Sequence, residues 1–92
     1  MNVDYENLPR DLESGYFRES LHEELLLGFR QIHSAGERLP PSSHYASQIA
    51  EIVNRGAPSP LAEETKYELY QEILSACESA RQEVMGEEVK PQ

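Results

Sequence analysis

The chain has 92 residues, of which 38% are hydrophobic, and its formal net charge at pH 7 is −9. This length allows one domain with a small core, because such a chain buries only roughly 60–65% of the surface that it exposes when unfolded. The negative field disfavours direct contact with nucleic acid or anionic lipid, so we expect a protein partner, and a basic one if charge guides recognition.

The first half of the chain contains the signals for one long helix. Pro9 can open a short helical turn, because its missing N–H is not needed at a helix start. Ser14 can cap the long helix that follows. We expect that helix at about residues 15–35, with Gly36 as the residue that ends it.

Two further helices are predicted in the second half, and each follows a proline-rich connector. Pro40 and Pro41 prevent the first helix from continuing, and a shorter helix is expected at about residues 43–55. Pro60 suits the first position of a third helix, which we expect at about residues 60–85. That helix should end at Gly86.

These elements predict an all-α fold, a small helical bundle of two long helices and one shorter connecting helix. We expect one helical domain over residues 1–92, with flexible ends at about 1–7 and 87–92. Three- and four-residue spacing marks the apolar face of each helix. The predicted core residues are Phe17, Leu21, Leu25, Gly28, Phe29 and Ile32, then Tyr45, Ile49, Ile52 and Val53, then Tyr70, Ile73, Leu74, Cys77, Ala80 and Val84.

Leu26 lies on the flank of the predicted core stripe of the first helix and Leu27 on its largely polar side, where an intramolecular core accounts poorly for them. Single exposed leucines are ordinary in monomers. Two of them next to a long, partly uncovered helix indicate a surface that faces a partner or a second copy. We therefore expect Leu26 and Leu27 to bind a partner, with a homo-oligomer as the simplest form.

Glu64, Glu68 and Glu72 recur at four-residue steps, opposite the core stripe of the third helix. Like charges at this spacing destabilise an isolated helix by about 0.2–0.5 kcal/mol per pair. The plain interpretation is a solvated helix face. The sharper hypothesis is that these three carboxylates form a docking strip for a partner rich in Arg and Lys.

Glu19 and His22 form a Glu-x-x-His pair, the spacing that carboxylate-bridged di-metal bundles use. Such a site needs the pair twice, and only a symmetric dimer of this chain could supply the second pair. Glu19 also falls on the polar side of its helix, in the first turn, where the helix dipole favours a carboxylate. We expect solvated helix surface here and no metal, and keep a dimeric metal-binding bundle as the alternative.

Nothing in the sequence predicts catalysis. Cys77 lies in the predicted core, where an apolar setting suppresses thiol reactivity. The chain contains neither a Gly-x-Ser-x-Gly motif nor a phosphate-binding glycine loop. We therefore expect a protein that is not an enzyme and that needs no cofactor.

A single cysteine and an N-terminus without a signal-peptide pattern predict a soluble, cytoplasmic protein without a membrane-spanning segment. Its expected function is that of a small acidic protein-binding or regulatory factor that acts through helical surfaces and self-associates. Two further hypotheses remain open. One is the metal-binding carboxylate bundle, and the second is an acidic mimic of nucleic acid that blocks a basic nucleic-acid-binding protein.

Overall fold

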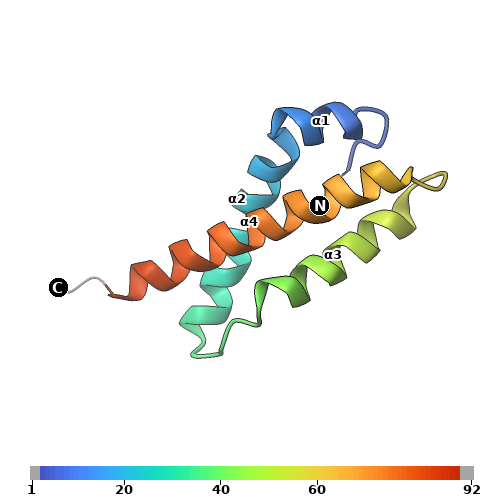
Figure 1. Cartoon of the computed structure of the whole chain (residues 1–92). Coiled ribbons are helices and arrows are strands. Elements are labelled where there is room, and N and C mark those ends of the chain that lie inside the picture. Colours follow the sequence, from blue (N-terminus) through green and yellow to red (C-terminus); the bar gives the residue numbers. More distant parts are fainter. Residues whose placement is uncertain (1–2, 90–92) are drawn as a thin grey trace.

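The computed structural model describes the backbone of residues 3–89 and the side chains of residues 3–86. This part of the chain is all helical, with no strand, which confirms the predicted class. Four helices replace the predicted three, because the turn expected at Pro9 is a helix of its own (Figure 1). The helices are α1 (Leu8–Ser14), α2 (Tyr16–Ser34), α3 (Ser42–Gly56) and α4 (Glu63–Val89).

A glycine corner separates α1 from α2. Gly15 has a φ of +86°, a left-handed conformation that glycine adopts without the steric cost of a Cβ. Ser14 stands just before this corner, and its hydroxyl accepts a hydrogen bond of 3.3 Å from the backbone N–H of Tyr16. The serine therefore provides an acceptor for the N–H of the first residue of α2, but the N-cap residue is Gly15 and not Ser14 as predicted.

The connector between α2 and α3 lies where the sequence predicts it, whereas both ends of α4 depart from the prediction. Gly36, with a φ of +80°, follows the last turn of α2 as predicted. Helix α4, which is the third helix predicted from the sequence, begins at Glu63 and not at Pro60, and it continues through Gly86 to Val89. The prediction that Gly86 ends this helix is wrong, because a glycine inside a helix costs only about 1 kcal/mol relative to alanine. Of the flexible ends expected at about residues 1–7 and 87–92, residues 1–2 and 90–92 lie outside the described residues.

The long helix α4 is the central element of the bundle. It packs against both α2 and α3, and α1 packs against α2 and α4. In the described chain no Cα atom of α2 lies within 8 Å of one in α3. These two helices meet at their connected ends, where the ring centroids of Phe29 and Tyr45 are 4.9 Å apart, and they spread apart from there (Figure 1).

Eight of the sixteen predicted core residues are buried, six are half-buried, and Gly28 and Ile52 are exposed. Leu26 is only 7% exposed and packs with Phe29, whereas Gly28 is exposed and Leu25 is half-buried. The face of α2 that meets α4 is thus turned from the predicted centre of the stripe toward Leu26. Ile52, predicted to be in the core, is 67% exposed. The buried apolar side chains are Leu8, Leu12, Phe17, Leu21, Leu26, Phe29, Leu39, Ala46, Val53, Leu69, Ile73, Ala76, Cys77, Ala80 and Val84.

The segment before α1 also contacts the bundle. Val3 and Tyr5 are half-buried against the core, and the hydroxyl of Tyr5 donates a hydrogen bond to the backbone carbonyl of Val53 in α3. This segment therefore bridges the open ends of α2 and α3. Among the described residues, none of the helices combines the length and the apolar character that crossing a membrane requires.

Candidate functional site

An apolar groove lies where α2 and α3 spread apart. Its volume is about 570 Å³, and both helices and the segment before α1 contribute walls. We call it the α2–α3 groove. Its lining residues are Val3, Tyr5, Leu21, Glu24, Leu25, Ile49, Ile52, Val53 and Gly56.

A second hollow adjoins this groove and continues it toward α1. The second hollow, of about 230 Å³, shares Val3, Leu21 and Glu24 with the groove, and we call it the α1–α2 hollow. Asp4 and Asp11 also line it. Among the described residues, the charged side chains that line either space are Asp4, Asp11 and Glu24, and no Lys or Arg joins them. The combined surface is apolar with an acidic edge.

The sequence makes this groove because α2 and α3 carry more apolar surface than α4 covers. Phe29 and Leu26 of α2 are buried on the α4 side, which leaves Leu25 half-buried on the groove side. On α3, Val53 is buried against the core while Ile52, its neighbour, faces the groove and is largely exposed. The apolar side chains of α2 at the groove are Leu21 and Leu25, which the sequence assigned to the core, and not Leu26 and Leu27, which it assigned to a partner-facing surface.

The two leucines predicted to face a partner have different surroundings. Leu26 is covered by the chain's own second core cluster, with Phe29, Leu39, Ala80 and Val84. The expectation that an intramolecular core leaves Leu26 uncovered is therefore wrong. Leu27 is 65% exposed, but it lines neither the α2–α3 groove nor the α1–α2 hollow.

The three glutamates of the predicted docking strip do not share one environment. Glu64 and Glu68 are exposed on α4. Glu72 is half-buried and accepts hydrogen bonds of 3.1 and 3.4 Å from Nη1 of Arg18 in α2. Glu72 therefore belongs to the contact between α2 and α4, and the strip is shorter than predicted.

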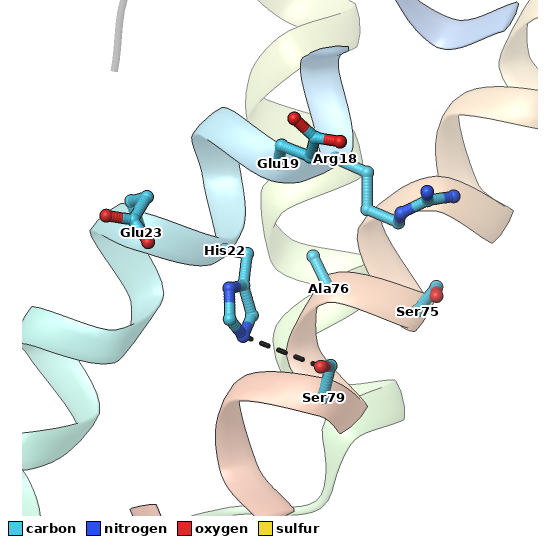
Figure 2. Close-up of a pocket in the computed structure, with 7 residues that line it drawn as sticks. All are labelled: Arg18, Glu19, His22, Glu23, Ser75, Ala76 and Ser79. Atoms are coloured by element: carbon cyan, nitrogen blue, oxygen red, sulfur yellow. Dashed lines mark hydrogen bonds between the residues drawn. The ribbon is translucent and has the colours of Figure 1, made fainter. Parts of the chain in front are cut away.

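Glu19 and His22 line a separate, polar hollow of about 410 Å³ between α2 and α4 (Figure 2). Nε2 of His22 lies 3.5 Å from Oγ of Ser79, within reach of a weak hydrogen bond. Figure 2 shows the His22 ring pointing toward Ser79, while the carboxylates of Glu19 and Glu23 lie away from it. Within residues 3–86 no group of three or more His, Cys, Asp or Glu side chains is arranged to hold a metal ion.

The cysteine is placed as a core residue. Cys77 is fully buried, and burial raises the pKa of its thiol from the usual 9.0 to about 11, with a smaller contribution from the negative charge of Glu78. The pKa of Tyr45 is also raised, chiefly by burial and then by Cys77. A thiol that holds its proton so firmly is a poor nucleophile at neutral pH.

The sequence predicted none of the groove residues that come from the segment before α1. The signal was weak: Val3 and Tyr5 are two apolar side chains within an otherwise polar stretch, and Asp4 stands between them. Tyr5 reaches a helix 48 positions away in the chain, a contact that local patterns do not reveal. Comparison of the chain with protein-family models, with curated protein sequences and with solved structures gave no match.

Proposed function

We propose that this chain is a small acidic protein-binding factor that acts through its helical surfaces and not through catalysis. The observation that carries the proposal is the α2–α3 groove, an open apolar surface in a chain of net charge −9. Ile52, with 67% of its surface exposed, stands in this groove beside half-buried Leu25 and Ile49. A contiguous exposed apolar surface with a polar edge is typical of a protein-interaction site.

Self-association is the second candidate, and Leu27 supports it. This leucine is largely exposed on α2, apart from the groove, and could contact a second copy. The net charge of −9 on each copy opposes such an assembly, most strongly at low ionic strength. We therefore place a different protein before a second copy as the partner.

A metal-binding bundle and a nucleic-acid mimic have weaker support. The metal-binding bundle requires two copies whose Glu19 and His22 converge on the same ions. The nucleic-acid mimic requires a long acidic face, to which Glu64 and Glu68 contribute while Glu72 pairs with Arg18. The exposed apolar groove supports protein binding and neither of these.

Site-specific photocrosslinking tests the proposal. The full chain is prepared with a photoreactive amino acid at Ile52 and, as the matched control, at Leu27, since these side chains are 67% and 65% exposed. Each is irradiated in a lysate of the source cells, and covalent adducts are identified by mass spectrometry. We expect a protein adduct that forms from position 52 and not from position 27.

Two further outcomes decide between the candidates. An adduct between two copies at position 27 would favour self-association. The absence of protein adducts from both positions, at low and at high salt, would contradict the proposed function.

A further inference from the structure

We infer that the α2–α3 groove receives an amphipathic helix of a different protein, with its apolar stripe in the groove and with Lys or Arg toward the α1–α2 hollow. This inference rests on the proposed function and names the chemistry of the partner and its orientation.

The arrangement of the helices gives the shape of the occupant. Packed helices lie about 8–10 Å apart, and no Cα atom of α2 is within 8 Å of one in α3 over the described chain. The two helices touch at the Phe29 and Tyr45 rings and are held by α4 on one side. Where they diverge, two helical walls face a shared space of about 570 Å³. An amphipathic helix laid into an apolar groove is a recurrent mode of recognition that suits two such walls.

The lining of the groove gives the apolar half of the partner. Leu21 and Leu25 come from α2, and Ile49 and Ile52 come from α3, so aliphatic side chains stand on both walls. Their spacing along each helix is three or four residues, which matches the i, i+3, i+4 and i+7 anchors of an amphipathic helix. The partner helix should therefore present Leu, Ile, Val or Met along one stripe.

The charged residues give the polar half and the orientation. Asp4, Asp11 and Glu24 all line the α1–α2 hollow, where Glu24 stands at its border with the groove, and no Lys or Arg among the described residues lines either space. Asp4 also accepts a hydrogen bond of 2.7 Å from the Asn7 side-chain amide. Complementary charge steers association and fixes register, so the flank of the partner helix on this side should be basic. A second copy, itself carrying −9, does not meet this requirement.

The test uses the full chain and fluorescent synthetic peptides of about 18 residues, which are about 27 Å long as helices. One set carries leucines at helical spacing and lysines on one flank, in several registers. A second set has the same composition in scrambled order, and a third has Glu in place of Lys. Fluorescence anisotropy measures binding, and circular dichroism verifies that each protein variant is folded.

We expect the ordered Lys peptides to bind and the scrambled and Glu peptides to bind at least about tenfold more weakly. Ile52→Glu should weaken binding about tenfold or more, as the loss of a central apolar contact does. Its matched control, Leu27→Glu, adds the same charge at an equally exposed leucine outside the groove and should change affinity less than about twofold.

A second pair of variants tests the charge argument. The variant with Asp4→Asn, Asp11→Asn and Glu24→Gln removes the acidic edge, whereas Glu63→Gln, Glu64→Gln and Glu68→Gln removes as many charges from α4. We expect only the first triple variant to weaken binding at low salt and to reduce its salt dependence. Equal effects of the two triple variants would show that the overall field attracts the peptide and would overturn the assigned orientation.

The remaining outcomes separate this inference from the proposed function. Failure of every ordered Lys peptide, or equal losses in Ile52→Glu and Leu27→Glu, overturns the inference, while a protein crosslinked from position 52 would still support the proposed function. A wild-type dimer in sedimentation that Ile52→Glu dissociates would show that a second copy occupies the groove and would also overturn the inference. Peptide binding without any protein crosslink in the lysate would contradict the proposed function and, with it, the assignment of a protein partner to the groove.

Discussion

The hydroxyl of Tyr5 donates a hydrogen bond of 2.7 Å to the backbone carbonyl of Val53, in the last turn of α3. In a helix that continued, this carbonyl would accept from the N–H of Ala57, which donates to Asn54 instead. Tyr5 thus supplies a donor to a carbonyl near the end of α3 that lacks its usual helical donor. Gly56 leaves room for it, since a Cβ at that position would lie 2.6 Å from the Tyr5 hydroxyl oxygen.

The first prediction is that the effect of Gly56→Ala on stability changes sign with the residue at position 5. In the wild type the new methyl group displaces the Tyr5 hydroxyl, and we expect a loss of about 1 kcal/mol, the usual net contribution of one hydrogen bond. In Tyr5→Phe that oxygen is absent, and alanine should be neutral or stabilising because glycine is a poor helix former. Urea unfolding of the two single variants and the double variant measures the coupling. Identical effects of Gly56→Ala in both backgrounds would show that the Tyr5 hydrogen bond does not require the space that Gly56 leaves.

The second prediction compares two neighbouring leucines. Leu26 is 7% exposed in the core cluster around Phe29 and Ala80, so Leu26→Ala should lower the free energy of unfolding by about 2–5 kcal/mol. Leu27→Ala, at a largely exposed position of the same helix, should change it by less than about 0.5 kcal/mol. Thermal and urea unfolding of both variants gives the comparison. Similar small losses in both would mean that Leu26 faces a partner, as its place in the sequence pattern indicates.

Local signals were enough to predict the helix class and several helix ends. Gly36 ends α2, and Pro40 and Pro41 separate it from α3, because these residues restrict the backbone whatever the rest of the chain does. The buried face of α4 was also largely predictable, since Ile73 and Cys77 repeat at helical spacing on a helix with partners on two sides.

Local sequence patterns could predict neither the rotation of α2 about its axis nor the α2–α3 groove. The apolar face of α2 is broad because it includes both Leu21 and Leu26. Periodicity gives the centre of this face but does not show which part of it packs against α4. The same limit hid the exposure of Ile52. The contact of Tyr5 with Val53 joins residues 48 positions apart, and the α2–α3 groove depends on it for one wall. The candidate site is therefore a tertiary feature whose residues had to be found in the structure.

The third prediction concerns the ion pair between Arg18 and Glu72. Their side chains are 42% and 21% exposed, so solvent screens the attraction, and Glu72→Gln should reduce stability by no more than about 1 kcal/mol. Glu68→Gln, on the exposed face of the same helix, should have less effect or a slightly favourable one because it relieves repulsion. Urea unfolding at low and high salt measures both. A larger loss of stability in Glu68→Gln than in Glu72→Gln would indicate that the predicted acidic strip stabilises the fold through contacts other than the Arg18–Glu72 ion pair.

The fourth prediction is a loss of stability at alkaline pH that depends on Cys77. Burial raises the pKa of this thiol from 9.0 to about 11, so below pH 9 the proton is held in both the folded and the unfolded chain. Above pH 9 the unfolded thiol ionises first, and the free energy of unfolding should fall by up to about 1.4 kcal/mol per pH unit until about pH 11.

The matched variant is Cys77→Ala, in which this part of the slope should disappear. Because the pKa of Tyr45 is raised as well, a smaller slope of the same sign should remain. The comparison uses the slopes of unfolding free energy against pH, since alanine also removes buried volume and lowers stability at every pH. Parallel slopes for the wild type and Cys77→Ala would show that the thiol ionises as easily in the folded chain as in the unfolded one.

The last prediction addresses the Glu-x-x-His pair. The His22 ring is turned toward Ser79, 3.5 Å from its hydroxyl, and the carboxylate of Glu19 is exposed and lies away from that ring. Added iron, manganese or zinc should therefore leave the melting temperature of the full chain unchanged. Glu19→Ala should change the free energy of unfolding by less than about 0.5 kcal/mol, as at other exposed positions.

A dimer is the one arrangement that could reverse this expectation, because it would bring two Glu19 and His22 pairs together. Melting is therefore measured at low and high protein concentration, with sedimentation under the same conditions. A metal that binds only the folded dimer would raise the melting temperature more at high concentration, by mass action. If such a rise occurs in the wild type and vanishes in both Glu19→Ala and His22→Ala, the pair is half of a metal site and the dimeric metal-binding bundle replaces the protein-binding factor.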